Sequence, residues 1–236
     1  MKKLIATAAL LATMFTANAV FAGIEPEAAL DSLMAGNATF AATGTVPNLE
    51  AMSSIVRRAT VAAGQHPDAV ILACADSRLS PEIIFNKGLG EVFVVRVAGN
   101  IVAPHELGSI EYAIEHLGAK LVMVLGHTNC GAVKATYDAA AANTLRPGVV
   151  PRSAMQGNIG SLVKDISPAV NESFREGLNA CIVTNVENVV KEMEENSTII
   201  KEGIELGEVK VVAAEYDLGT GVVSLLPEHH EEEHSN

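Results

Sequence analysis

The sequence predicts an α/β fold with a mostly parallel central sheet of four strands plus a short fifth strand, helices on both faces, and an N-terminal helical arm. Short apolar runs alternate along the chain with longer segments of helical pattern. Most of these runs are continuously apolar, which is typical of parallel strands buried on both faces. The runs that we expect to form strands are 70–73, 92–97, 121–125, 209–214 and 222–226.

The first 22 residues have the three regions of a secretory signal peptide. Lys2 and Lys3 precede an apolar run over residues 4–15, which is shorter than the ~20 residues of a membrane span. Small residues at Ala19 and Ala22 offer two cleavage points, and we expect cleavage after Ala22. The mature protein should therefore be exported to a bacterial periplasm.

Length and composition fit one folded domain after that segment. The chain has 236 residues, of which 49% are hydrophobic, so it can bury a sizeable core. We expect this domain to cover residues 23–227. Residues 228–236 form an acidic tail with three histidines, and such charged ends are usually solvated and disordered, although histidines can also gather metal ions.

The net charge of the chain indicates which binding partners to expect. The formal net charge is −12, and it becomes −14 when residues 1–22 leave with their two lysines. Nucleic acid is not an expected partner, because neutralising phosphates requires clustered Lys and Arg. The mature sequence contains no second candidate for a membrane span, so we expect no membrane association after signal removal.

The helices follow from turn residues and apolar periodicity. Pro26 opens the first helix of the N-terminal arm, and Gly44 and Pro47 mark a loop before a helix over 53–63. Further helices are expected over 81–86, 105–117 and 132–142, with a long pair between 158 and 205. Residues 143–157 are expected to form a surface loop, and 217–221 a turn.

Three metal-binding residue types follow two of the expected strands. Cys74 comes directly after the first strand, and His127 and Cys130 follow the third. Parallel strands place their carboxyl ends at one edge of the sheet, where open α/β sheets bind ligands. Two thiolates and an imidazole suit tetrahedral Zn²⁺ with a fourth position free for solvent. Spacing alone leaves simpler interpretations open: a buried apolar cysteine, or a hydrogen-bonded loop histidine.

The motifs around these residues resemble the β-class carbonic anhydrases. They are Cys-Ala-Asp-Ser-Arg at 74–78, Val-Arg-Val-Ala-Gly-Asn at 95–100 and Gly-His-Thr-Asn-Cys-Gly at 126–131. The likeness extends from 33–37 to 216–221. It implies one Zn²⁺ per subunit, held by Cys74, His127 and Cys130. It also implies reversible hydration of CO₂ to bicarbonate and a proton by a zinc-bound hydroxide.

Asp76 and Arg78 are the expected catalytic pair beside the metal. Asp76 is close enough in sequence to Cys74 to accept a hydrogen bond from the attacking hydroxide. The planar fork of Arg78 can hold that carboxylate ionised and away from the metal. The structural alternative is an ion pair that caps the next helix.

Three further residues match the family only through the resemblance. Gln65 matches a glutamine that reaches across the dimer interface, although on its own it looks like a surface loop residue. Tyr112 and His116 share a helix face and match proposed proton-shuttle positions, but a packed aromatic and a surface histidine are equally simple interpretations. The resemblance also implies a homodimer or a higher even homo-oligomer, in which the N-terminal region wraps the neighbouring subunit.

Some β-class enzymes close when Asp leaves Arg and becomes a fourth zinc ligand, a state that bicarbonate holds through a pocket of Trp, Arg and Tyr. This chain has no Trp, and the matching position is Ile71; of that pocket, Arg96 alone matches. Bicarbonate could then supply little differential binding energy to the closed state. We expect a permanently open site with Asp76 paired to Arg78.

Two alternatives to a carbonic anhydrase stay open at this point. A CS₂ or COS hydrolase would use the same ligands, whereas a non-catalytic zinc-binding protein would have no use for Asp76 and Arg78. A thiol oxidoreductase is disfavoured because the sequence has no Cys-x-x-Cys. The remaining cysteine, Cys181, lies on the apolar face of an expected helix and should be core.

Overall fold

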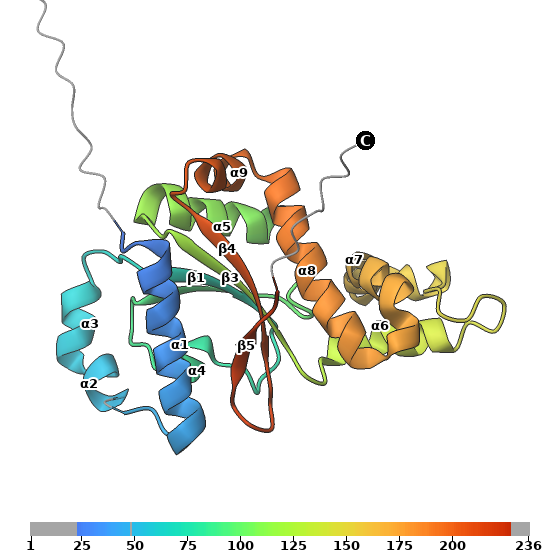
Figure 1. Ribbon diagram of the computed structural model, residues 1–236, viewed down its shortest axis with the longest axis horizontal. Helices are drawn as coiled ribbons and strands as arrows, with labels where there is room; N and C mark the ends of the chain where they lie inside the picture. Colours follow the sequence, from blue (N-terminus) through green and yellow to red (C-terminus); the bar gives the residue numbers. More distant parts are fainter. Residues whose placement is uncertain (1–22, 48, 228–236) are drawn as a thin grey trace, which may run out of the picture.

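The computed structural model describes residues 23–47 and 49–227, which form a five-stranded sheet in the order β2-β1-β3-β4-β5 with helices packed on it (Figure 1). The first four strands pair in parallel and β5 pairs antiparallel with β4, so the predicted mostly parallel sheet is confirmed. The strands are β1 (Ala69–Ala73), β2 (Val92–Arg96), β3 (Leu121–His127), β4 (Lys210–Tyr216) and β5 (Val223–Leu225).

Burial separates the central strands from the outer ones. Every residue of β1 and β3 is buried, as continuous apolar runs predict. The same expectation is wrong for β2, which is partly exposed at the sheet edge, and for β4, whose burial alternates. β4 lies between β3 and the three-residue edge strand β5.

Helices cover both faces of the sheet. Alternate residues of β1 point to opposite sides: Ile71 belongs to a buried cluster that includes residues of α1 and α4, whereas Leu72 belongs to one that includes residues of α5, α8 and α9. The helices are α1 (Pro26–Thr43), α2 (Leu49–Ser53), α3 (Ile55–Val61), α4 (Pro81–Ile84), α5 (Pro104–Leu117), α6 (Gly131–Ala141), α7 (Gly157–Ser173), α8 (Leu178–Asn196) and α9 (Thr198–Glu205). Two short 3₁₀ segments, η1 (Arg152–Met155) and η2 (Phe174–Glu176), flank α7.

Serine caps set the limits of two expected helical segments. The helix expected over 53–63 is observed as α3, and the short α2 lies before the expected range. Ser54 separates the two helices, because it is extended and its side chain accepts a hydrogen bond from the Arg57 amide at 3.0 Å. Likewise, Ser197 ends α8 and caps α9 by accepting from the Ile200 amide at 3.2 Å. The expected long pair between 158 and 205 is therefore three helices.

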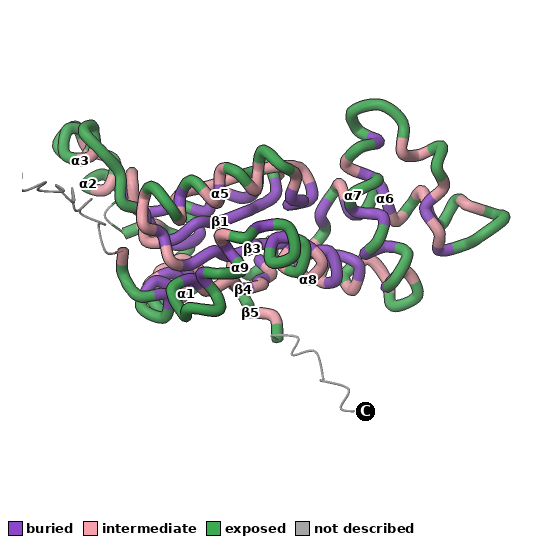
Figure 2. Tube along the Cα trace, turned by 90° about the horizontal axis from the view of Figure 1, so that it is seen from above, coloured by how far each residue is buried: buried purple, intermediate pink, exposed green. Residues whose placement is uncertain are grey.

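The N-terminal arm has one packed part and one exposed part. Helix α1 buries Leu33 in the core, and Asn37 joins it to the β5 hairpin through the Gly221 carbonyl and the Val223 amide. Helices α2 and α3 contain no buried residue and lie at one end of the molecule (Figure 2). Ile55 is 76% exposed and Val56 is 75% exposed.

Between residues 23 and 227, leaving out residue 48, no helix combines the length and the apolar character that crossing a membrane requires. The expected signal peptide at 1–22 and the expected tail at 228–236 lie outside the described residues.

Candidate metal centre

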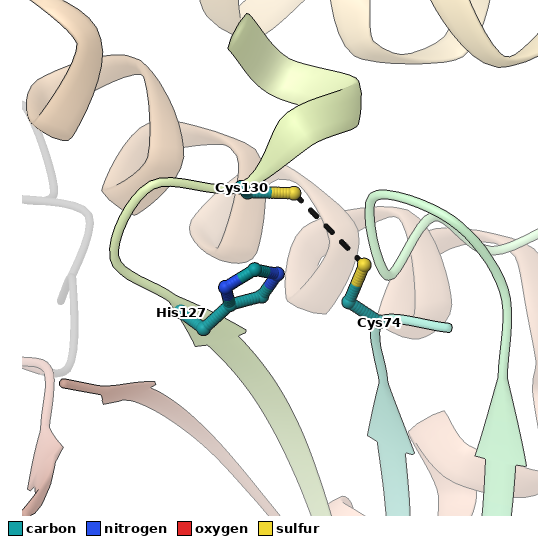
Figure 3. A group of neighbouring side chains, drawn as sticks. All are labelled: Cys74, His127 and Cys130. Atoms are coloured by element: carbon teal, nitrogen blue, oxygen red, sulfur yellow. Dashed lines mark hydrogen bonds between the residues drawn. The ribbon is translucent and has the colours of Figure 1, made fainter. Parts of the chain in front are cut away.

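Cys74, His127 and Cys130 meet at the carboxyl edge of the sheet, and their side chains point toward one another (Figure 3). Cys74 directly follows β1, His127 is the last residue of β3, and Cys130 caps the start of α6. Because β1 and β3 are parallel neighbours, with Ala73 opposite Leu125, both strand ends reach the same place. One potential ligand atom from each residue lies within 4.8 Å of the other two.

The arrangement fits a zinc ion. The two sulfur atoms lie 4.0 Å apart, and Zn–S bonds of about 2.3 Å at a tetrahedral angle would separate them by about 3.8 Å. His127 is fully buried, and its Nε2 has no hydrogen-bond partner among the described residues. An unpaired buried nitrogen is costly, and a metal ion would satisfy it.

A neighbouring carbonyl sets the tautomer of His127. Its Nδ1 lies 3.0 Å from the Thr128 carbonyl oxygen, so Nδ1 carries the proton and donates to that oxygen. Thr128 is itself held by its amide, which donates to the Tyr216 carbonyl at 3.0 Å, and by its hydroxyl, which accepts from the Leu218 amide at 3.1 Å. The Nε2 lone pair is therefore left free and aimed toward the sulfurs.

The two thiols affect each other's ionisation. The hydrogen bond from Cys130 lowers the pKa of Cys74 to about 4, against the opposing effect of burial, and the Gly99 amide helps by donating to Sγ at 3.3 Å. The same contact and burial raise the pKa of Cys130, because a second negative charge beside the first is unfavourable. The amides of Ala132 and Val133 at the start of α6 act in the other direction. A divalent cation between the sulfurs would favour both thiolates.

Asp76 lies at the border of this cluster and is paired with Arg78. Arg78 donates from Nε to Oδ1 at 2.9 Å and from Nη2 to Oδ2 at 2.6 Å. These bonds hold the pKa of Asp76 well below its usual range, and Oδ2 lies 3.9 Å from His127 Nε2. Asp76 thus stays ionised next to the ligands, which suits a hydrogen-bond acceptor better than a general base.

The pair does not cap the next helix. The N-cap of α4 is Ser80, and Asp76 Oδ1 instead accepts from the Arg78 amide at 2.9 Å within its own turn. Arg78 Nη2 also approaches the Asn129 carbonyl at 3.5 Å, so it bridges the segments that carry Cys74 and Cys130.

The structure of one chain does not bring Gln65, Tyr112 or His116 to this cluster. Gln65 is exposed before β1, whose length puts about 16 Å between its ends. Tyr112 and His116 lie about 12 and 18 Å along α5 from its start, with ring centroids 5.1 Å apart. Tyr112 contacts Phe93 of β2 and lines an open cavity of about 450 Å³. We call this surface, formed by Phe93, Tyr112 and His116, the β2–α5 side.

Sequence reasoning missed the observed contacts of Arg96. It matched Arg96 to a bicarbonate pocket, whereas its guanidinium donates to the Cys74 and Asp76 carbonyl oxygens at 3.0 and 2.6 Å. The signal was indirect: Arg96 ends β2, which lies next to the strand that leads into Cys74.

Comparison with known proteins gives consistent results. A family model described as "Carbonic anhydrase" matches residues 69–223. A carbonic anhydrase of Mycolicibacterium smegmatis is 38% identical over 203 residues, covering 85% of this chain and 93% of the relative. Carbonic anhydrase 2 of Mycobacterium tuberculosis is 39% identical over 199 residues, covering 83% and 90%.

Two solved structures are similar over most of their length. The Coccomyxa β-carbonic anhydrase in complex with acetazolamide has a TM-score of 0.60 at 31% identity, covering 72% of this chain and 76% of that one. A β-carbonic anhydrase of Aspergillus fumigatus has a TM-score of 0.63 at 25% identity, covering 88% and 93%.

Proposed function

We propose that this chain, which belongs to the carbonic anhydrase family, uses zinc at Cys74, His127 and Cys130 to hydrate CO₂ reversibly to bicarbonate and a proton. The protein is a carbonic anhydrase and hence a lyase. The observation that carries the proposal is the juxtaposition of a complete ligand set with an ionised acceptor, Asp76, whose Oδ2 is 3.9 Å from His127 Nε2.

Each ligand is prepared by its own surroundings. Thr128 leaves Nε2 of His127 as the coordinating nitrogen, and the Gly99 amide supports the Cys74 thiolate. The amides at the start of α6 do the same for Cys130. Zinc, when bound, supplies a Lewis acid that lowers the pKa of a coordinated water from 15.7 toward about 7.

Asp76 orients the attacking solvent molecule. Its carboxylate would accept a hydrogen bond from that solvent molecule, and this bond would leave a lone pair of the solvent oxygen directed at the carbon of CO₂. Arg78 occupies both carboxylate oxygens with donors at 2.9 and 2.6 Å, so the acceptor cannot rotate freely. The same grip supports a permanently open site, because Asp76 would have to break two charge-assisted bonds to become a ligand. Ile71, fully buried in β1, stands where the closing enzymes have Trp.

A second copy of the chain would complete the site. Gln65, Tyr112 and His116 lie away from their own cluster, and α3 exposes Ile55 and Val56. Exposed apolar residues on α3 and an open cavity beside Tyr112 favour an interface. The proposal is a homodimer or a higher even homo-oligomer in which Gln65 contacts substrate, and Tyr112 and His116 move protons, at the partner's metal centre.

Export of the mature chain, residues 23–236, to the periplasm is also proposed. It rests on the N-terminal pattern of lysines, apolar run and small residues. The domain limits 23–227 and the tail 228–236 belong to the same proposal.

The alternatives gain no support from the comparisons. The relatives and structural neighbours above are named carbonic anhydrases, and none is named a CS₂ or COS hydrolase or a zinc-storage protein. An oriented acceptor at the ligand cluster further disfavours a storage role.

The test is stopped-flow CO₂ hydration by the zinc-loaded chain 23–236, with CS₂ offered in parallel. The expected result is saturable hydration that a chelator abolishes and zinc restores, with no release of sulfide from CS₂. Hydration at the uncatalysed rate by a chain that holds one zinc would refute the proposal.

A further inference from the structure

Arg96 joins the edge strand β2 to the segment that carries the first metal ligand. Its Nε donates to the Cys74 carbonyl at 3.0 Å, and its Nη2 donates to the Asp76 carbonyl at 2.6 Å. Ala73 is opposite Arg96 in the parallel register, so the side chain starts directly beside the end of β1. One guanidinium therefore binds the carbonyl oxygens of both Cys74 and Asp76, the residues on either side of Ala75.

The backbone hydrogen bonds between β1 and β2 end at the segment that carries Cys74 and Asp76. The last ladder bonds run from the Val97 amide to the Ala73 carbonyl at 3.2 Å and from the Ala75 amide to the Val97 carbonyl at 3.1 Å. Cys74 lies between these two bonds and Asp76 lies beyond them, where the chain leaves the sheet and enters the site. The two carbonyls that Arg96 binds take its guanidinium as a donor at the point where the strand ladder ends.

The two arginines hold different parts of the same segment. Arg78 binds the carboxylate of Asp76, which sets the side chain. Arg96 binds the backbone on both sides of Ala75, which sets the separation between the Cys74 and Asp76 α-carbons. Fixing a ligand and an acceptor relative to each other requires both, because a fixed side chain on a mobile backbone still moves.

The geometry also requires an arginine. A planar fork can donate to two carbonyls at once, whereas a lysine ammonium is a compact charge on a flexible stem and would hold one carbonyl at a time. The bonds are charge-assisted, and the 2.6 Å bond is short for its type.

We propose that Arg96 is a positioning residue of the metal centre: it fixes Cys74 and Asp76 relative to each other through their backbone carbonyls. This inference rests on the proposed function in that the segment is taken to hold zinc. Outer-shell partners of metal ligands typically contribute about 10- to 100-fold in metal affinity or activity, and that range is expected for Arg96.

The test compares Arg96→Gln and Arg96→Lys in the full mature chain. Zinc affinity is measured by competition with a chromophoric chelator, and the cobalt-substituted protein is examined for its thiolate-to-cobalt absorption bands. Arg96→Gln should bind zinc about 10- to 100-fold more weakly and shift or broaden those bands, and Arg96→Lys should recover only part of the loss. The matched control is Arg146→Gln, an exposed arginine in the loop after α6 for which the structure gives a backbone contact to Asn143.

Two results would overturn the assignment. The first is an Arg96→Gln variant that binds zinc within about 3-fold of the control and has the same cobalt bands as the control within error. That result would show that the carbonyl bonds do not position the ligands. A fall of more than about 5 °C in the melting temperature of metal-free Arg96→Lys would indicate a general structural role instead. Because affinity and spectrum need no turnover, a wild-type chain that binds zinc but does not hydrate CO₂ would refute the proposed function and leave this test intact.

Discussion

The metal-ligand cluster and the β2–α5 side differ in burial and in completeness. The cluster is buried, and every ligand has a local partner that sets its protonation or direction. On the β2–α5 side, Tyr112 is 48% exposed, its ring lies tilted against that of His116, and it lines an open cavity. We therefore propose that one chain can hold the metal by itself, whereas the handling of substrate and proton draws on a surface that a single chain leaves open.

Replacing a ligand should have the largest effect. In Cys130→Ser the buried cluster loses a thiolate, so zinc affinity should fall by at least about 100-fold and CO₂ hydration should approach the uncatalysed rate. Zinc content by elemental analysis and stopped-flow rates measure both.

Cys181→Ala is the control for this change, because Cys181 is equally buried but lies in α8 away from the ligands. It should lose some stability and keep one zinc per chain. Equal zinc loss in both variants would contradict the assignment of Cys130.

Removing the hydrogen bonds that hold the Asp76 carboxylate should have the second-largest effect on the hydration rate. Arg78→Ala removes the two donors that hold the carboxylate, and misplacement of a catalytic group by about 1 Å can reduce a rate about 100-fold. Since Arg78 is largely exposed, the melting temperature should change little.

Turnover and thermal unfolding of the zinc-loaded variant separate the two roles. A loss of stability as severe as the loss of rate would favour a structural ion pair.

A charged residue on the exposed helix α3 tests whether a second copy of the chain contributes to activity. Ile55→Glu on α3 should shift the protein to monomers in sedimentation and lower the hydration rate about 10-fold, while the buried ligand cluster keeps its zinc.

Ile159→Glu is the matched control, because Ile159 on α7 is also 76% exposed. It should leave assembly and rate unchanged. A monodisperse, fully active monomer of either variant would show that the cluster works without the partner's residues.

The smallest effect is expected at His116. His116→Ala should slow CO₂ hydration only in dilute buffer, where proton transfer limits turnover, by less than the roughly 100-fold lower end of general acid–base effects. His105→Ala, at another exposed histidine of α5, is the control. An unchanged rate for His116→Ala in dilute buffer would end its role as a proton shuttle.

Local patterns in the sequence were sufficient for the fold class, and they placed the candidate ligands at one edge of the sheet. The apolar runs determine which segments become buried strands, and a ligand placed directly after such a run must appear at the carboxyl edge. For this reason Cys74, His127 and Cys130 could be proposed together without a structure, although spacing alone left simpler interpretations open. The choice of zinc, and the catalytic roles of Asp76 and Arg78, came from the resemblance to the β-class carbonic anhydrases. Serine caps are also local signals, so the division at Ser54 and at Ser197 was available in principle but weaker than the helical periodicity around it.

Other features depend on register between segments far apart in the chain. The sequence by itself determined the fold class and, through the resemblance, the proposed ligands and acceptor pair. Only the tertiary structure decided that Arg96 binds the carbonyls of Cys74 and Asp76, because that contact needs β2 beside β1 in one particular register. It likewise decided that Gln65, Tyr112 and His116 lie away from their own metal centre, since strand and helix direction, which spacing does not encode, carries them to the opposite end of the sheet.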